Sequence, residues 1–354
     1  MALPEVPLAR QHHRGGHERS PARHPCRARP GIAKEPLMSF ALTTDQRDLL
    51  EVARAFLADV YPTERAARSS DSTEGWDPDS WVQLVEMGWI GVALPEERGG
   101  AGFGHVEETI LVEELARCLY AGPFLSTVLA LPALEAADAA DALAGRSRWS
   151  FEVDGLVPDL DRVDRVLSAA GAVDATGDLL ATVDPTRHVG RLAGSAGGTT
   201  ADVDRAQLLT YLAAESLGVA EAALEIAVGY AKERTQFGAV IGKLQGIQHP
   251  LADTFTDLMV GRSLVQAAAW RLDARPDDAL RSATMAKAFL GDAAVVATER
   301  AIQVHGGIGF TWEHPLHRYY KRAVWLQAFG GNAAAQRALI REELAPIDQV
   351  VSGA

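Results

Sequence analysis

Long helical segments dominate the second half of this sequence, and they limit the possible folds more than any other feature. From Asp202 onward the chain is almost entirely made of stretches with the pattern of amphipathic helices, joined by short connections. Helices of this kind pack side by side as an antiparallel four-helix bundle. The predicted bundle helices cover residues 202–233, 245–274, 277–304 and 332–345.

A second helical region lies nearer the start of the chain. Thr43 and Gln46 have the spacing of a capping box, and apolar residues follow them at helical intervals. Asp77 and Pro78 predict the start of a second helix, and a third helix around Leu111 follows a glycine-rich loop. This pattern predicts an N-terminal helical domain.

Between the two helical regions the sequence changes to short apolar runs bounded by Gly, Pro and Asp, which are typical of strands joined by turns. These runs are Trp149–Val153, Arg165–Ser168 and Leu179–Val183. A region of this size is too small for an independent barrel. We therefore predict a mainly α-helical protein with an N-terminal helical domain at 38–145, a small β-module at 146–200 and a C-terminal four-helix bundle within 201–354.

The first 37 residues have a different composition. They contain six Pro, four His and seven basic residues against three Glu, and they show no helical or strand periodicity. Because such a segment cannot bury enough apolar surface to offset the entropy of ordering, we predict that residues 1–37 are disordered. A transit peptide is also Arg-rich, but this segment lacks an apolar core and an amphipathic face. A start codon set too early, with Met38 as the true beginning, is the favoured explanation.

Charge and composition exclude several kinds of partner. Seven of the 34 basic and three of the 47 acidic residues lie in the first 37 positions. The rest of the chain therefore has 27 basic and 44 acidic residues, a net charge of −17. Such a surface repels nucleic acid and anionic lipid, and no apolar run approaches the roughly 18 residues that span a bilayer. Cys26 and Cys118 are too few for a disulfide framework. We expect a soluble, cytoplasmic protein without metal, nucleic-acid or membrane sites.

The first motif with chemical content ends the first predicted bundle helix. Arg234 offers a fork of donors suited to a phosphate, Gln236 offers an amide, and Phe237 offers a flat ring. Gly238 is a typical helix cap, and Gln245 adds a second amide seven residues later. A capped helix end with solvated polar residues would explain the same pattern.

The second motif, Gln303–Phe310, ends the third predicted bundle helix. Its clustered glycines would let a ligand approach the backbone closely, and Gln303 supplies a donor beside them. It is not a dinucleotide-binding fingerprint, because no strand precedes it and the third glycine of G-x-G-x-x-G is absent. A helix terminator followed by a turn is the simpler explanation of this motif alone.

Taken together, the two motifs resemble the acyl-CoA dehydrogenase family. The run Met87–Gly102 looks like the helical-domain loop of the same family, and Thr311–Ala323 continues the resemblance directly after the second motif. The resemblance covers about residues 40–130 and 200–345.

This resemblance implies FAD, an acyl-CoA substrate, an electron-accepting flavoprotein and α,β-dehydrogenation of the thioester. In that reaction a carboxylate takes the Cα proton, flavin N5 accepts the Cβ hydride, and hydrogen bonds stabilise the enolate-like charge. The family holds the ADP portion of FAD across a subunit interface. The matching residues of this chain are Arg234, Gln236, Phe237, Gln245, Gln303, Gly306 and Gly307.

The chain departs from the family at the catalytic base. Counted without gaps from Phe310, the family's catalytic Glu falls on Gly330. The base position that other members use, counted back from Arg234, falls on Leu208. Neither residue can take a proton, so both usual base positions are empty.

Glu215 is the remaining candidate for the base. It lies seven residues beyond Leu208, on the same helical face and in an otherwise apolar run, where burial would raise the pKa of its carboxyl. Two helical turns are roughly 11 Å along the axis, a long displacement for a reacting group. A buried Glu that is paired with a neighbouring helix or subunit is the favoured alternative.

The β-module is shortened relative to the family, and nothing between Arg146 and Thr200 matches the family's Trp-Ile-Ser/Thr element, which covers the isoalloxazine ring. The chain thus keeps the contacts to a neighbour's FAD and lacks those that seat its own. We therefore predict one subunit of a hetero-oligomeric acyl-CoA dehydrogenase, with a second acyl-CoA dehydrogenase-like subunit as partner. Two alternatives stay open: a homo-oligomer that uses Glu215 as base, and a non-redox scaffold with the same fold.

Overall fold

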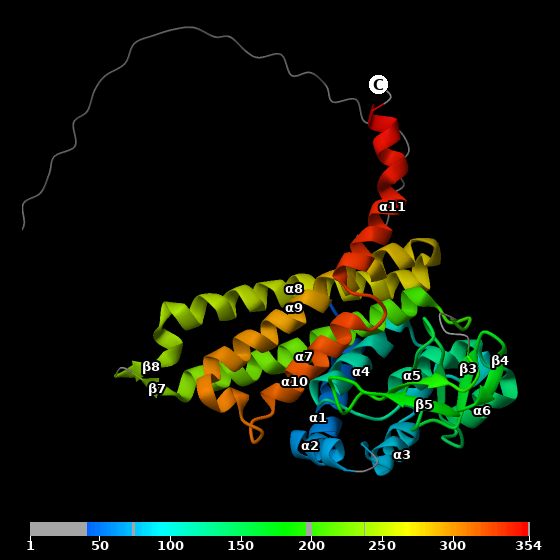
Figure 1. The fold of residues 1–354 in the computed structure, drawn as a ribbon, viewed down its shortest axis with the longest axis horizontal. Helices are drawn as coiled ribbons and strands as arrows, with labels where there is room; N and C mark the ends of the chain where they lie inside the picture. The colour runs from blue at the N-terminus through cyan, green and yellow to red at the C-terminus, as the bar shows by residue number, and fades with distance from the viewer. Residues whose placement is uncertain (1–40, 73–74, 196–199, 237, 353–354) are drawn as a thin grey trace, which may run out of the picture. The chain divides into compact units, whose positions relative to one another are not determined.

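The structure is a computed structural model that describes residues 41–72, 75–195, 200–236 and 238–352 (Figure 1). The predicted disorder of residues 1–37 lies outside these ranges. Within them, no helix is long and apolar enough to cross a membrane.

Six α-helices precede the first strand in the described ranges. The capping box is confirmed, because Thr43 Oγ1 accepts from the Gln46 amide at 3.2 Å and Gln46 Oε1 accepts from the Thr43 amide at 3.0 Å. Asp77 also caps its helix as predicted. The helices are α1 (Thr44–Val60), α2 (Thr63–Asp71), α3 (Pro78–Glu86), α4 (His105–Arg117), α5 (Phe124–Ala130) and α6 (Ala136–Leu143), with 3₁₀ turns η1 (Trp89–Gly91), η2 (Glu96–Arg98) and η3 (Leu131–Ala133).

The β-module forms two three-stranded sheets, ordered β1-β3-β4 and β2-β6-β5. The β1–β3 pair is parallel and the other pairs of these two sheets are antiparallel. The third predicted strand begins earlier and ends sooner than expected, because the chain turns after Leu180 towards the buried Asp184. The strands are β1 (Trp149–Phe151), β2 (Val157–Pro158), β3 (Arg165–Ser168), β4 (Gly171–Asp174), β5 (Gly177–Leu180) and β6 (Val189–Leu192).

The C-terminal helices form the predicted bundle, with one correction to its membership. Helices α7 (Arg205–Glu233), α8 (Gln245–Ala274) and α9 (Pro276–His305) match the first three predicted segments. The fourth helix of the bundle is α10 (Leu316–Ala328), which packs against α7 and α9, whereas α11 (Ala333–Ser352) packs chiefly against α9 (Figure 1). Buried residues of α10 recur at helical spacing, which explains its place in the core.

Helix α7 is the central element, because α4, α8, α9 and α10 all pack against it. Its contact with α4 is close enough to require a glycine. A Cβ on Gly218 would lie 2.2 Å from the carbonyl oxygen of Glu113 in α4, so any side chain there would push the two helices apart.

The segment before β6 connects the three parts of the chain through buried charges. Arg322 of α10 is fully buried, and it donates to Asp184 Oδ2 at 2.5 Å and to Thr186 Oγ1 at 2.6 Å. Arg162, also buried, donates to the carbonyl of Thr186 at 2.9 Å and to that of Ala121 at 2.5 Å. Burial alone would raise the pKa of Asp184, but the charge of Arg322 outweighs it and lowers that pKa. The β-module is thereby fixed to both helical regions.

Replacing Arg322 by Met should lower the free energy of unfolding by about 3–5 kcal/mol, because it leaves the buried Asp184 without a countercharge. Urea unfolding of the full chain measures this loss. The matched control is Arg146→Met, whose partner Asp141 lies at 2.6 Å with both side chains more than half exposed. Such a surface pair contributes only about 0–1 kcal/mol. Equal effects of the two substitutions would contradict the role given to Arg322.

Candidate functional site

The first two turns of α7 present two different faces to the rest of the molecule. Asp204 caps the helix, and its Oδ1 accepts from two backbone amides of the first turn at 2.7 and 3.3 Å. Asp204, Gln207 and Tyr211 follow the spacing of one helical face. Arg205 and Leu209 lie on the opposite face, because each residue is rotated by about 100° from the one before it.

Gly330 lies against the face that carries Arg205 and Leu209. It follows the end of α10 with φ of +73°, and its carbonyl accepts from Arg205 Nη2 at 3.2 Å. A Cβ at this position would lie 2.8 Å from Leu212 Cδ1 and 3.5 Å from Leu209 Cδ2. Leu208, the second expected base position, is also buried. The two positions to which counting along the sequence assigned the family's carboxylate are therefore a glycine in close contact with leucine side chains and a buried leucine.

Glu215 is buried two helical turns beyond Leu208 on α7, and Arg187 forms an ion pair with its Oε1. Its Oε2 and the hydroxyl of Tyr120 have no hydrogen-bond partner among the described residues. All three residues line a cavity of only about 10 Å³. That space is close to the minimum for one water molecule and is far too small for an acyl chain.

The bundle ends in a hairpin of β7 (Thr235–Gln236) and β8 (Ala239–Val240) (Figure 1). Helix α7 stops at Glu233, so the expectation that Gly238 caps it was wrong. Gly238 instead lies at the turn of the hairpin with φ of +77°, because the chain leaves the helix in an extended conformation. Phe237 lies outside the described residues.

Both sequence motifs lie at this end of the bundle. Tyr230 near the end of α7 stacks on His305 at the end of α9, with ring centroids 4.2 Å apart. Among the described residues, the side chains of Arg234, Gln236 and Gln303 form no hydrogen bond or ion pair and are exposed. Gln245 begins α8 and is exposed too, and the backbone of Gly306 and Gly307 follows α9 in the turn η5 (Gly306–Phe310).

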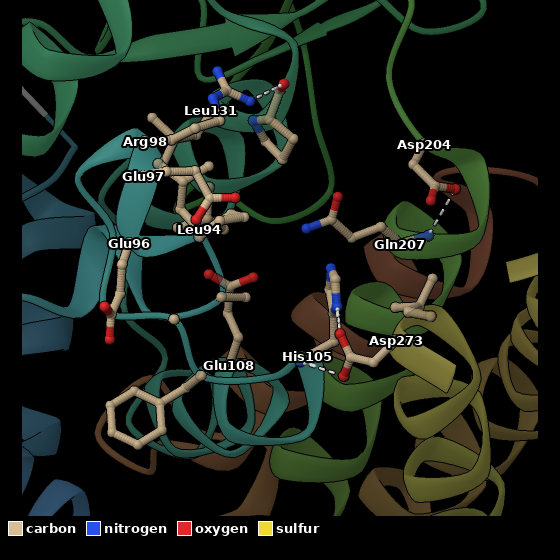
Figure 2. Close-up of a pocket in the computed structure, with 17 residues that line it drawn as sticks. Leu94, Glu96, Glu97, Arg98, His105, Glu108, Leu131, Asp204, Gln207 and Asp273 are labelled. Carbon is tan, nitrogen blue, oxygen red and sulfur yellow. Dashed lines mark hydrogen bonds and ion pairs between the residues drawn. The ribbon is translucent and has the colours of Figure 1, made fainter. Parts of the chain in front are cut away.

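A large pocket lies on the face of α7 that carries Asp204 and Gln207, and the sequence alone did not reveal it. It has a volume of about 730 Å³ and lies between the start of α4, the α5–η3 segment, the start of α7 and the end of α8. Figure 2 shows the side chains of Glu108, His105 and Gln207 projecting towards the same space. Its apolar lining comes from Leu94, Phe103, Val128, Leu131 and Leu272.

Hydrogen bonds fix the polar side chains of this pocket. Gln207 Nε2 donates to the Tyr211 hydroxyl at 3.2 Å, and that hydroxyl donates to Glu108 Oε2. Asp273 at the end of α8 holds His105 twice, through Nδ1 at 2.6 Å and through the backbone amide at 2.9 Å. The orientations of Glu108 and His105 are thus set by residues from two other helices.

Burial changes the acidity of these groups. Desolvation raises the pKa of the Glu108 carboxyl to about 6, although the hydrogen bond from Tyr211 opposes the rise. Burial lowers the pKa of His105, but the hydrogen bond and charge of Asp273 outweigh it, and the pKa is raised. The pocket therefore holds a buried carboxyl with a raised pKa and a His–Asp pair.

The signal that could have identified Glu108 was weak. It stands in an apolar stretch of α4, where three carboxylates are buried, and the other two form ion pairs with arginines. Periodicity places all three in a helix, but only the packing of α4 against α7 separates Glu108 from the paired carboxylates.

Comparison with known proteins identifies the class of this fold. Residues 43–139 match the acyl-CoA dehydrogenase N-terminal domain, and residues 209–345 match the acyl-CoA dehydrogenase C-terminal domain. The chain is 37% identical to acyl-CoA dehydrogenase IpdE2 of Mycobacterium tuberculosis, over 79% of this chain and 91% of that protein. It is 31% identical to IpdE2 of Mycolicibacterium smegmatis, over 79% of this chain and 93% of that protein.

Two solved structures share the fold at high similarity. The ChsE4-ChsE5 complex of Mycobacterium tuberculosis contains a chain with a TM-score of 0.77 and 25% identity, covering 87% of this chain and 99% of that one. The steroid ACAD Tcur3481-Tcur3483, in its G363A variant, contains a chain with a TM-score of 0.77 and 26% identity. The match covers 86% of this chain and 99% of that one.

The chain belongs to the acyl-CoA dehydrogenase family, as its motifs predicted. Members of this family are oxidoreductases that act on a CH–CH group with FAD as cofactor.

Replacing Glu108 by Gln should change the pH dependence of stability. Because folding raises the pKa of Glu108 from 4.5 to about 6, its protonated form stabilises the fold below pH 4.5, and this contribution is lost as the pH rises through 6. Between pH 4.5 and 7.5, the free energy of unfolding of the wild-type chain should fall by about 2 kcal/mol relative to that of Glu108→Gln. Urea unfolding at both pH values measures the difference.

The exposed Glu97→Gln serves as control, and its difference from the wild type should not change over this range. If the stability difference between the wild type and Glu108→Gln were also the same at both pH values, folding would not raise the pKa of Glu108.

Proposed function

We propose that this chain is the subunit of a hetero-oligomeric, FAD-dependent acyl-CoA dehydrogenase that does not supply the catalytic base. The observation that supports this proposal is the contact around Gly330, where the glycine predicted to replace the family's carboxylate lies against Leu209 and Leu212. The base and the seat of the flavin ring then come from a second acyl-CoA dehydrogenase-like subunit. The complexes named for ChsE4-ChsE5 and Tcur3481-Tcur3483, which each pair two differently named chains, support this arrangement by similarity.

The fit to FAD differs between the two ends of the cofactor. At the end of the bundle, an exposed guanidinium and exposed amides suit a diphosphate and its ribose, with Arg234, Gln236 and Gln303 as the contacts. Beside Gly330, in contrast, even one added carbon atom would lie 2.8 Å from Leu212 Cδ1, which supports seating the reactive ring in the partner subunit. FAD accepts the hydride when bound, and this chain would hold only its ADP portion.

Exposed apolar side chains near the same end support a subunit interface. Ile308 is 51%, Phe310 75% and Trp312 72% exposed, all within or directly after η5. Exposed large apolar side chains that cluster in this way mark surfaces that bind another protein. A partner that covers them would lie beside Arg234 and Gln303, as an ADP site shared between subunits requires.

The homo-oligomeric alternative requires Glu215 to act as the base. Its ion pair with Arg187 and the small size of the adjacent cavity favour a structural role instead. An acyl-CoA substrate and an electron-accepting flavoprotein would serve the assembled enzyme, and both are proposed from family membership.

Arg234→Ala should weaken FAD binding in the assembled complex about tenfold or more, because a charge-assisted hydrogen bond contributes about 1.5–3 kcal/mol. The full chain would be co-expressed with a second acyl-CoA dehydrogenase-like chain that has an intact base. Flavin content is then measured by visible absorption, with the exposed Arg68→Ala as control. Unchanged flavin affinity in Arg234→Ala would contradict the contact of Arg234 with the ADP portion of FAD. A chain that is yellow when purified without any partner would favour the homo-oligomer.

Glu215→Gln should leave the turnover of the hetero-complex within threefold of the wild type, while this chain alone should oxidise no acyl-CoA. The assay follows enoyl-CoA formation with an artificial electron acceptor at matched flavin content. The substitution should lower stability, because Arg187 loses its countercharge. If Glu215 were the base, turnover would fall by roughly 10²–10⁴-fold, and the proposed division of roles would be wrong.

A further inference from the structure

Tyr120, Arg187 and Glu215 each carry a buried polar atom that has no hydrogen-bond partner among the described residues, and all three line one small cavity. The atoms are the Tyr120 hydroxyl oxygen, Arg187 Nε and Glu215 Oε2. The cavity has a volume of about 10 Å³, and the rest of its lining is Gly122 and the apolar side chains of Val112, Leu115, Phe124 and Leu125. Because buried polar groups are nearly always hydrogen-bonded, three such atoms around one cavity indicate a ligand inside it.

The three polar atoms reach the cavity from different parts of the chain. Tyr120 lies between α4 and α5, and a Cβ on Gly122 would lie 2.3 Å from its hydroxyl oxygen. The hydroxyl therefore lies beside a glycine that lines the cavity. Arg187 belongs to the segment before β6, and its Nη2 donates to Glu215 Oε1 of α7. That ion pair uses one atom of each partner and leaves Arg187 Nε as a donor and Glu215 Oε2 as an acceptor.

Size and charge restrict what the cavity can hold. A volume of about 10 Å³ is enough for one water molecule and for nothing larger. Three buried arginine–carboxylate pairs lie close enough together to act on one another: Arg187–Glu215, Arg162–Asp159 and Arg322–Asp184. Their charges cancel, so neither a cation nor an anion would meet an uncompensated charge there. The ligand must be very small, neutral and able both to donate and to accept hydrogen bonds.

We propose that this cavity binds one water molecule, which accepts from Arg187 Nε, donates to Glu215 Oε2 and forms a third hydrogen bond with the Tyr120 hydroxyl. Three hydrogen bonds are the usual number for a buried water. The water joins the α4–α5 connection, the segment before β6 and α7 at one point, so it adds to the contacts that fix the β-module to both helical regions. The inference uses neither flavin nor a partner subunit, and it does not depend on the proposed hetero-oligomer.

A crystal structure of the full chain, at a resolution that shows ordered water, tests the site directly. It should show density for one water within hydrogen-bond distance, about 2.6–3.2 Å, of all three atoms. A direct hydrogen bond between Arg187 Nε and Glu215 Oε2 with no density beside it would overturn the proposal. So would density whose anomalous signal identifies an ion.

The effect of Tyr120→Phe on stability tests the site in solution. If the hydroxyl is bonded to a buried water, its removal should raise the equilibrium constant for unfolding roughly fivefold, because one hydrogen bond is lost. If the cavity is empty, the substitution removes a buried hydroxyl that has no partner, and stability should stay the same or increase. Urea unfolding of the full chain separates the two outcomes, and a chain at least as stable as the wild type would contradict the proposed water.

Tyr61→Phe is the matched control. The rings of Tyr61 and Tyr120 meet edge to face with centroids 5.1 Å apart, and both side chains are buried. The Tyr61 hydroxyl also has no partner among the described residues, but Tyr61 does not line the cavity. Tyr61→Phe should therefore leave the equilibrium constant for unfolding within twofold of the wild type or lower it. Equal losses of stability in the two variants would show that the effect of Tyr120→Phe does not come from a water in this cavity.

Discussion

The buried pair of Arg322 and Asp184 is the interaction on which the arrangement of the three parts depends. Both charges are removed from water, and each is stable there only because the other is present. The pair joins α10 to the segment before β6, and Arg162 joins the same segment to the N-terminal helices. Arg187, which directly follows Thr186 in the same segment, adds the ion pair with Glu215 of α7. The β-module is thus joined to the helical regions by buried charged contacts, in addition to its own small apolar cluster of Val157, Leu160, Val163 and Val166.

This arrangement explains why Glu215 is a poor candidate for a catalytic base. A base needs space for its substrate and a proton site that is not already occupied, and Glu215 has an arginine on one oxygen and a very small cavity at the other. The face of α7 that carries Leu209 and Leu212 is filled in a different way, by apolar packing around Gly330. Together these features favour a structural role for the buried part of α7, whereas the proposed cofactor contacts lie at the exposed end of the bundle.

The sequence supported the helical architecture well and the site only in part. The caps at Thr43 and Asp77 and the three long bundle helices were predicted from local signals, because capping and periodicity act within a few residues. The place of α10 in the bundle and the hairpin turn at Gly238 were not, because neighbouring helices decide which of several amphipathic segments joins a core. The motif residues at Arg234 and Gln303 stay a prediction of function, since their exposure is compatible with a ligand and does not require one.

What the sequence by itself determined is the family, the order of its parts and the absence of a carboxylate at Gly330 and Leu208. These follow from residue identity, which needs no structure. Only the tertiary structure decided that Glu215 meets Arg187, and that Glu108 comes together with Tyr211, Gln207 and a large pocket. The reason is that desolvation and ion pairing depend on groups from distant parts of the chain. The same residue type in similar apolar stretches therefore becomes a paired structural charge in one place and a pocket-lining acid in another.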